Sequence, residues 1–141
     1  LMGQLARTAK DIPVILCHGR DVDPNLIQTW TDLGATLLPC GVRNAQLDAE
    51  DVLAQLGAHG LTRIFCEGGS ALAASLIAAD LVDQLVGFTA GLNIGAEGLP
   101  CIGALGLDKL HAAHRFDLRE TRAVGPDVMH VWERKTDGCA L

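Results

Sequence analysis

The chain has 141 residues, an apolar fraction of 49% and a formal net charge of −6. This length is typical of one domain, and the apolar fraction provides a buried core and argues against disorder. The negative net charge and the scattered Lys and Arg residues disfavour nucleic acids and anionic membrane surfaces as binding partners. Backbone N–H groups can still bind a small anion. Because neither a signal peptide nor a bilayer-spanning apolar run is present, we expect a cytoplasmic protein.

The first half of the chain alternates predicted strands and helices. Residues 12–17 form a short apolar run bounded by Pro and Gly, which predicts a buried strand. Asp23 followed by Pro24 is typical of a helix start, and Gly34 predicts the end of that helix. A second strand is expected over residues 35–40.

The same alternation continues through the middle of the chain. Asp48 predicts the start of a helix that ends near Gly57 or Gly60. Three further elements, a strand, a helix and a strand, are expected over residues 61–66, 70–79 and 85–89. Strands and helices that alternate with short loops indicate an α/β layer fold with a mostly parallel sheet.

The pattern changes in the last third of the chain. Residues 93–106 are rich in Gly and predict a long loop. Residues 116–123 and 128–133 alternate between apolar and polar types, and a turn signal at Gly125-Pro126-Asp127 separates them. We therefore expect a C-terminal antiparallel hairpin at the sheet edge, and a single domain over residues 1–141.

The cysteine and histidine patterns argue against disulfide and metal frameworks. The five cysteines are odd in number and contain no C-x-x-C spacing, which favours buried free thiols in a reducing cytoplasm. The five histidines lack metal-ligand spacing, so we predict no metal site. The Asp48–Asp51 run is the acidic first turn of a helix, and Trp30 and Trp132 are expected to be packing residues.

The stretch with chemical content is Gly68-Gly69-Ser70, between a predicted strand and a predicted helix. In open α/β sheets ligands bind beyond the carboxyl ends of the strands, where glycines let a phosphate approach the backbone. The helix start offers unpaired N–H groups, which suit a pyrophosphate. The alternative interpretation is an ordinary tight turn in which Ser70 is the N-cap. Neither G-x-G-x-x-G nor a P-loop is present.

Glu67 precedes the two glycines at the predicted carboxyl end of the strand. Its carboxylate can accept hydrogen bonds from a heterocycle N–H or from a sugar hydroxyl. It can equally cap local backbone donors. Both interpretations stay open on the residues alone.

The run Cys66-Glu67-Gly68-Gly69-Ser70-Ala71-Leu72 followed by Leu81-Val82-Asp83-Gln84-Leu85 resembles the VEGG-x-x-L … LVDEL signature of one enzyme family. That family is the reductase domain of bifunctional riboflavin biosynthesis proteins. The loop over residues 94–100 and the Gly125–Val128 turn are also similar to the family, so the resemblance covers essentially the whole chain. Gly91-Leu92 departs from the family, which often has Pro-Lys there. The family's first strands and N-terminal substrate residues have no counterpart and would precede Leu1.

The resemblance implies a dihydrofolate-reductase-like three-layer sandwich and a partial reductase domain. It implies NADPH-dependent reduction of a phosphorylated ribosylamino-pyrimidine to its ribitylamino form, and a homodimer. By the resemblance, Glu67 contacts the substrate. Seven further positions would contact NADPH, namely Gly69, Ser70, Ala71, Leu72, Ala73, Ala74 and Ser75. The catalytic proton donor stays unknown, because this segment contains no convincing candidate.

Two alternatives remain beside this interpretation. The chain can be another small-heterocycle reductase, such as a pteridine reductase, on the same fold. It can also be a non-catalytic ligand-binding or dimerisation module in which Gly-Gly is only a turn. An upstream zinc deaminase domain with H-x-E and P-C-x-x-C motifs would favour the riboflavin assignment.

Overall fold

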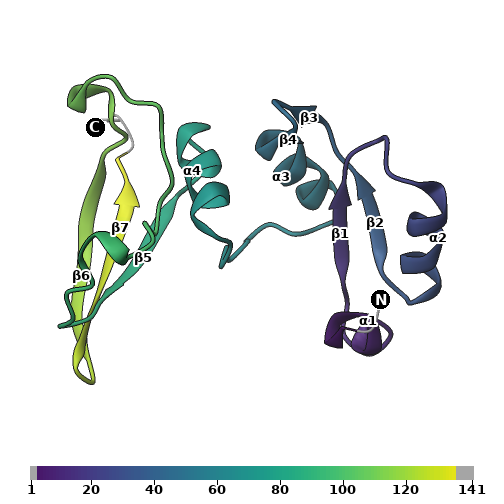
Figure 1. The fold of residues 1–141 in the computed structure, drawn as a ribbon, viewed down its shortest axis with the longest axis horizontal. Coiled ribbons are helices and arrows are strands. Elements are labelled where there is room, and N and C mark those ends of the chain that lie inside the picture. The colour runs from purple at the N-terminus through teal and green to yellow at the C-terminus, as the bar shows by residue number, and fades with distance from the viewer. Residues whose placement is uncertain (1–2, 136–141) are drawn as a thin grey trace. The chain divides into compact units, whose positions relative to one another are not determined.

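A computed structural model describes residues 3–135, whose elements are shown in Figure 1. The chain divides into two compact units, Leu1–Ile64 and Phe65–Leu141. Helices and strands alternate in the first unit, and an antiparallel sheet dominates the second. The predicted α/β class with a C-terminal antiparallel hairpin is confirmed. The expectation of one domain over residues 1–141 stays a prediction.

The first unit is built around one parallel strand pair, β1 (Ile15–His18) and β2 (Thr36–Pro39). Ile15 pairs with Thr36 and Cys17 pairs with Leu38, so the two predicted strands are confirmed within a few residues. The remaining elements are α1 (Gln4–Thr8), α2 (Pro24–Asp32), β3 (Val42–Arg43), β4 (Gln46–Leu47) and α3 (Ala49–Ala58).

The two longer helices of this unit begin where the sequence predicts. The Asp23 carboxylate accepts a hydrogen bond from the Asn25 N–H at 2.9 Å, and Pro24 occupies the first helical position of α2. Gly34 follows α2 with a φ of +96°, a conformation that costs glycine little. Asp48 caps α3 in the same way, accepting from the Glu50 N–H at 3.0 Å.

The small hairpin β3–β4 and the first helix α1 were not expected. The hairpin turns at Asn44 and Ala45, whose φ angles are 52° and 60°. Two-residue hairpin turns of this hand usually carry Gly at one of these positions. Because Ala45 replaces that glycine, the sequence lacks the usual signal for the turn.

The predicted strand over residues 61–66 is wrong. No ladder forms there, and the Ile64 and Phe65 side chains are 46% and 79% exposed. An apolar run favours extended backbone, but a strand also needs a partner backbone for its N–H and C=O groups. In residues 3–135, β1 pairs only with β2, and β5 pairs with β7. Gly68-Gly69 therefore does not follow a central parallel strand.

The second unit carries a three-stranded antiparallel sheet in the order β5-β7-β6 (Figure 1). Strands β6 (Phe116–Val124) and β7 (Asp127–Arg134) form the predicted hairpin, with a bulge between Leu118 and Glu120. The other elements are α4 (Ser70–Ala78), β5 (Gln84–Thr89), η1 (Gly95–Glu97) and η2 (Leu110–Ala112). In the described residues, parallel pairing is confined to β1 and β2.

The buried apolar residues of the first unit are small, whereas the second unit also buries two larger side chains. In the first unit the buried apolar residues are Ala6, Ala9, Ala35 and Cys40, and in the second they are Ala74, Ile77 and Met129. Cys40 has no exposed surface, in agreement with a buried thiol, whereas Cys66 and Cys101 are exposed. Buried thiols were expected, and for Cys66 this is wrong. Cys66 was to be the last residue of the strand predicted over residues 61–66, which does not form.

Candidate functional site

The helix α4 begins directly after the two glycines, and its first residue is Ser70. Gly69 is the N-cap, with φ −70° and ψ 174°, and no side chain caps the helix. The alternative interpretation with Ser70 as N-cap is therefore wrong. The N–H groups of the first turn keep their capacity to donate to a ligand, and the helix dipole favours an anion there.

The two glycines differ in the space around them. A Cβ at Gly68 would lie 2.5 Å from Leu72 Cδ2, so the turn packs tightly against the first turn of α4. A Cβ at Gly69 would meet no atom within 4 Å. A side chain at position 68 would therefore force Leu72 to move, whereas the space beside Gly69 is open and can admit a ligand.

A second glycine-rich segment lies against the start of α4. The Gly103 N–H donates a hydrogen bond to the Ser70 carbonyl at 2.9 Å, and a Cβ at Gly103 would lie 3.1 Å from the same oxygen. That Cβ would also lie 3.5 Å from the Ala74 side chain. The loop therefore covers one side of the first helical turn and fixes its position.

The remaining predicted site residues differ in exposure along α4. Ala71 and Leu72 are exposed, Ala73 and Ser75 are half-buried, and Ala74 is buried at 6% exposure beneath Gly103. The Ser75 hydroxyl donates to the Ala71 carbonyl at 3.0 Å. The side chain of Ala74 is thus used for packing, and the exposed positions are the ones available to a ligand.

Glu67 lies just before the glycines with an exposed side chain. Because no side chain caps α4, the capping interpretation of Glu67 has no support at this helix. The carboxylate is accessible to a ligand that approaches the start of α4.

The second half of the signature is anchored by an arginine that the sequence reasoning missed. The Arg134 guanidinium donates to the Asp83 carboxylate and, at 2.6 Å, to the Asp80 carbonyl. The hydrogen bond from Arg134 to Asp83 is the main cause that raises the pKa of the Arg134 guanidinium. The sequence offers one signal, a basic residue at the end of the last strand, opposite an acidic turn.

A histidine in the sheet is held by two neighbouring side chains. The Trp132 indole N–H donates to His130 Nδ1 at 2.7 Å, and Thr89 Oγ1 lies 3.2 Å from His130 Nε2. Because Nδ1 accepts, Nε2 carries the proton and donates to Thr89. The ring covers Gly87, where a Cβ would overlap it. The Trp132 and His130 rings also meet edge-on with centroids 6.0 Å apart, which agrees with the expected packing role, whereas the hydrogen bond was not expected.

A second group of polar side chains lies near the carboxyl end of β2, where the chain leads into α3. The Asp51 carboxylate accepts from the Gly41 N–H, which is the main cause that lowers the pKa of Asp51. The Gln55 amide donates to the same carboxylate at 3.3 Å. Arg43 and Asp48 form an ion pair at 2.9 Å. Glu50 and Asp51 lie in the first turn of α3, as predicted, and Asp51 also holds the chain after β2.

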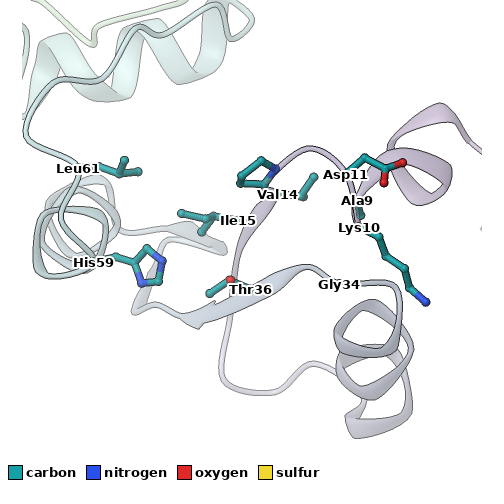
Figure 2. A pocket seen from close by; sticks show the side chains of 10 residues that line it. Ala9, Lys10, Asp11, Val14, Ile15, Gly34, Thr36, His59 and Leu61 are labelled. Carbon is teal, nitrogen blue, oxygen red and sulfur yellow. The ribbon is translucent and has the colours of Figure 1, made fainter.

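Figure 2 shows a pocket of about 460 Å³ within the first unit. It is lined by the end of the α1 segment, by Val14, Ile15 and Thr36 at the amino ends of β1 and β2, and by His59 and Leu61. Ligands of α/β folds bind at the opposite, carboxyl ends of the strands. The pocket contains none of the predicted site residues.

Residues 3–135 contain neither a cluster of metal-ligating side chains nor a membrane-spanning helix. No group of three or more His, Cys, Asp or Glu side chains there is placed to hold a metal ion. Within the same residues, no helix combines the length and apolar character needed to cross a bilayer.

Comparison with solved structures supports the fold. RibD of Acinetobacter baumannii superimposes with a TM-score of 0.67 at 15% identity, covering 86% of this chain and 37% of that one. A pyrimidine reductase-like protein from Corynebacterium diphtheriae gives a TM-score of 0.68 at 17% identity, covering 87% and 50% of the two chains. At these identities the likeness establishes the fold alone.

Sequence comparison establishes the family. The chain is 28% identical over 127 residues to the riboflavin biosynthesis protein RibD of Actinobacillus pleuropneumoniae, covering 89% of the chain and 34% of that protein. It is 35% identical over 99 residues to RibD of Escherichia coli, covering 70% and 27%. The chain thus spans about a third of the length of these relatives. A profile of the RibD C-terminal domain matches residues 5–130. The chain therefore belongs to the family of RibD C-terminal domains.

Proposed function

We propose that the chain carries the cofactor-binding part of an NADPH-dependent reductase of riboflavin biosynthesis. Its substrate is 5-amino-6-(5-phosphoribosylamino)uracil, and its product is the ribitylamino form. The single observation that carries this proposal is the family match over residues 5–130. The open, uncapped start of α4 beside Gly69 supports it independently, because it suits a dinucleotide pyrophosphate.

In this proposal the Gly69–Ser75 segment holds the cofactor. The N–H groups of the first turn of α4 donate to the pyrophosphate, and the absence of a side chain at Gly69 lets the phosphate oxygens approach. The exposed methyl group of Ala71 and the side chain of Leu72 lie beside that approach and leave room for an extended ligand. The loop at Gly103 fixes the helix start, so the donors are preorganised.

The reaction needs a hydride acceptor and a proton. NADPH supplies the hydride when bound. The sugar of the substrate opens to an imine, whose carbon accepts the hydride, and its nitrogen takes up one proton to give the ribitylamine. The chain holds the two partners in contact and excludes water, and Glu67 accepts hydrogen bonds from the substrate. The proton donor is not assigned to any residue of this chain.

We further propose that the protein works in the cytoplasm as a homodimer. The dimer is inferred from the family resemblance. Light scattering at micromolar concentration tests it, and a monomeric mass at that concentration would contradict it.

The cofactor site is tested with Gly69→Val in the full chain. The backbone angles of Gly69 are ordinary for any residue and its Cβ position is empty, so the variant should fold normally. A branched side chain there blocks the phosphate, and we expect NADPH affinity to fall at least about tenfold, equal to 1.4 kcal/mol. Binding is measured by fluorescence titration, after circular dichroism has shown that the variant is folded.

The matched control is Gly57→Val, which also places a branched side chain in open space, on α3. It should bind NADPH as the wild type does. A folded Gly69→Val variant with wild-type affinity would show that the glycines are merely a turn. Titration with NADH in parallel decides which nicotinamide cofactor is preferred.

Activity assays with two different substrates distinguish between the competing functions. NADPH oxidation is followed with the phosphoribosylamino-uracil and, separately, with a pteridine. Turnover of the pteridine alone would favour another small-heterocycle reductase on this fold. Binding of NADPH without turnover of either compound would favour a ligand-binding module.

A further inference from the structure

One edge of the sheet in the second unit is protected against pairing with another chain. This edge is strand β6, whose charged residues are Asp117, Arg119, Glu120 and Arg122. A bulge also interrupts its ladder with β7. Charged side chains and bulges are the usual devices that stop an edge strand from pairing with a further strand. The β6 edge is therefore closed to such pairing.

The opposite edge, strand β5, lacks these devices. Residues Gln84–Thr89 include no charged residue and no proline, and their register with β7 is regular. Within residues 3–135, β5 pairs with β7 alone, and no other backbone group bonds to its outer side. Val86 and Phe88 lie on one face of this strand and are 37% and 65% exposed. The β5 edge therefore offers free donors, free acceptors and apolar side chains to an approaching strand.

We propose that β5 pairs antiparallel with β5 of a second copy of this chain, so that the two sheets join into one. The inference rests on the homodimer proposed above and names its interface. A second copy suits this edge because neither β5 strand brings a charge to the contact, so no like charges oppose one another. Once two copies have paired, the edges left outside are the two charged β6 strands. Association therefore stops at the dimer.

Symmetry restricts the register of this pairing. In a sheet that continues across a twofold axis, opposed residues lie on the same face, and side chains alternate between the faces along a strand. Even-numbered residues must therefore oppose even-numbered ones. The register with Gly87 opposite its own copy places Val86 opposite Phe88 of the second copy, and does so twice. It thus pairs both exposed apolar side chains as β-branched and aromatic partners, a combination that stabilises sheets.

The experiment uses the full chain at micromolar concentration, with masses measured by sedimentation velocity. Val86→Lys places an ammonium opposite the aromatic ring of the second copy, and Phe88→Glu places a carboxylate opposite its valine. We expect each variant to raise the dissociation constant of the dimer at least about tenfold. Both native side chains are exposed, so the variants should fold, which circular dichroism verifies.

A mixture of the two variants tests the register. In a mixed dimer the introduced ammonium opposes the introduced carboxylate, and the second contact keeps the native Val86 and Phe88. Equimolar mixing should therefore restore a dimer that neither variant forms alone at the same concentration. General destabilisation of the fold or a different register would not give this recovery, so a mixture that stays monomeric would contradict the register.

The matched control is Leu118→Lys on β6, where the native side chain is also exposed. It should leave the dissociation constant of the dimer unchanged, because it alters the other edge. A Val86→Lys chain that dimerises like the wild type would overturn the β5 interface but not the homodimer. A monomeric wild type would overturn both and leave NADPH binding, which is titrated separately, untouched.

Discussion

The guanidinium of Arg134 binds the carboxylate of Asp83, so the end of β7 is tied to the turn that precedes β5. The same guanidinium reaches the Asp80 carbonyl at 2.6 Å. Asp80 has a φ of 55° and follows Ala79, the C-cap of α4. One side chain thus fixes both the end of α4 and the entry into the sheet.

We expect Arg134→Lys to lower the thermal midpoint, although the charge is kept. A lysine ammonium lacks the planar fork that binds Asp83 and the Asp80 carbonyl together. The matched control is Arg119→Lys, which alters an exposed ion pair with Glu133 that has no second partner in the described residues. Its midpoint should change less. Equal shifts in the two variants, measured by circular dichroism, would contradict a special role of Arg134.

Gly87→Ala should destabilise the protein by about 1–3 kcal/mol through overpacking against His130. The imidazole cannot turn away freely, because Trp132 and Thr89 hold its two nitrogens. Gly57→Ala, in an open helical position, should instead stabilise by about 0.5–1 kcal/mol. Urea unfolding measures both changes.

The cause of the Gly87 effect is tested by a double mutant. His130→Ala removes the ring, so adding Gly87→Ala to it should cost far less than in the wild type. If Gly87→Ala lowers the free energy of unfolding equally in the His130→Ala background, the effect does not come from a clash with the His130 ring.

Asp51 should make stability depend on pH in the acidic range. Its folded-state pKa lies below the ordinary value of 3.8, mainly because the Gly41 N–H donates to the charged form. A carboxyl with a depressed folded pKa contributes stability that is fully present above its unfolded pKa. That contribution is lost as the pH falls from about 3.8 through the folded pKa.

The Asp51→Asn variant isolates this contribution. The amide oxygen can still accept from Gly41, but it does not titrate, so the variant should be less stable than the wild type at pH 7. The difference in urea midpoint should shrink as the pH falls below 3.8. A constant difference over that range would show that Asp51 acts through packing instead.

The sequence predicts the helices best where a capping residue marks their start. Asp23 and Asp48 each cap a helix as expected, because a carboxylate next to free N–H groups is a local interaction. The hairpin β6–β7 was also predictable, since alternation and the Gly125 turn are local signals. The strand over residues 61–66 was not, because pairing depends on a partner that no local pattern can supply.

The turn into a helix at Gly68-Gly69 was predictable from the sequence, but the packing around it was not. The pattern at Gly68-Gly69 indicates a turn into a helix, which the structure contains. That one glycine is closed by Leu72 and the other faces open space depends on the side chains placed around the turn. The Arg134 hydrogen bonds and the contact of Gly103 with Ser70 join residues far apart in sequence, so a local pattern can at most suggest one partner of each pair.

The contact between Gly68 and Leu72 has a consequence for how this site can change in evolution. Because a Cβ at position 68 would meet the Leu72 side chain, a substitution at position 68 requires Leu72 to change its rotamer or to be replaced by a smaller residue. Gly69 is free of this constraint, and any ligand it serves decides which residues it accepts. Glu-Gly-Gly-x-x-Leu therefore combines a packing pair with a glycine beside open space, and the two should vary independently among homologues.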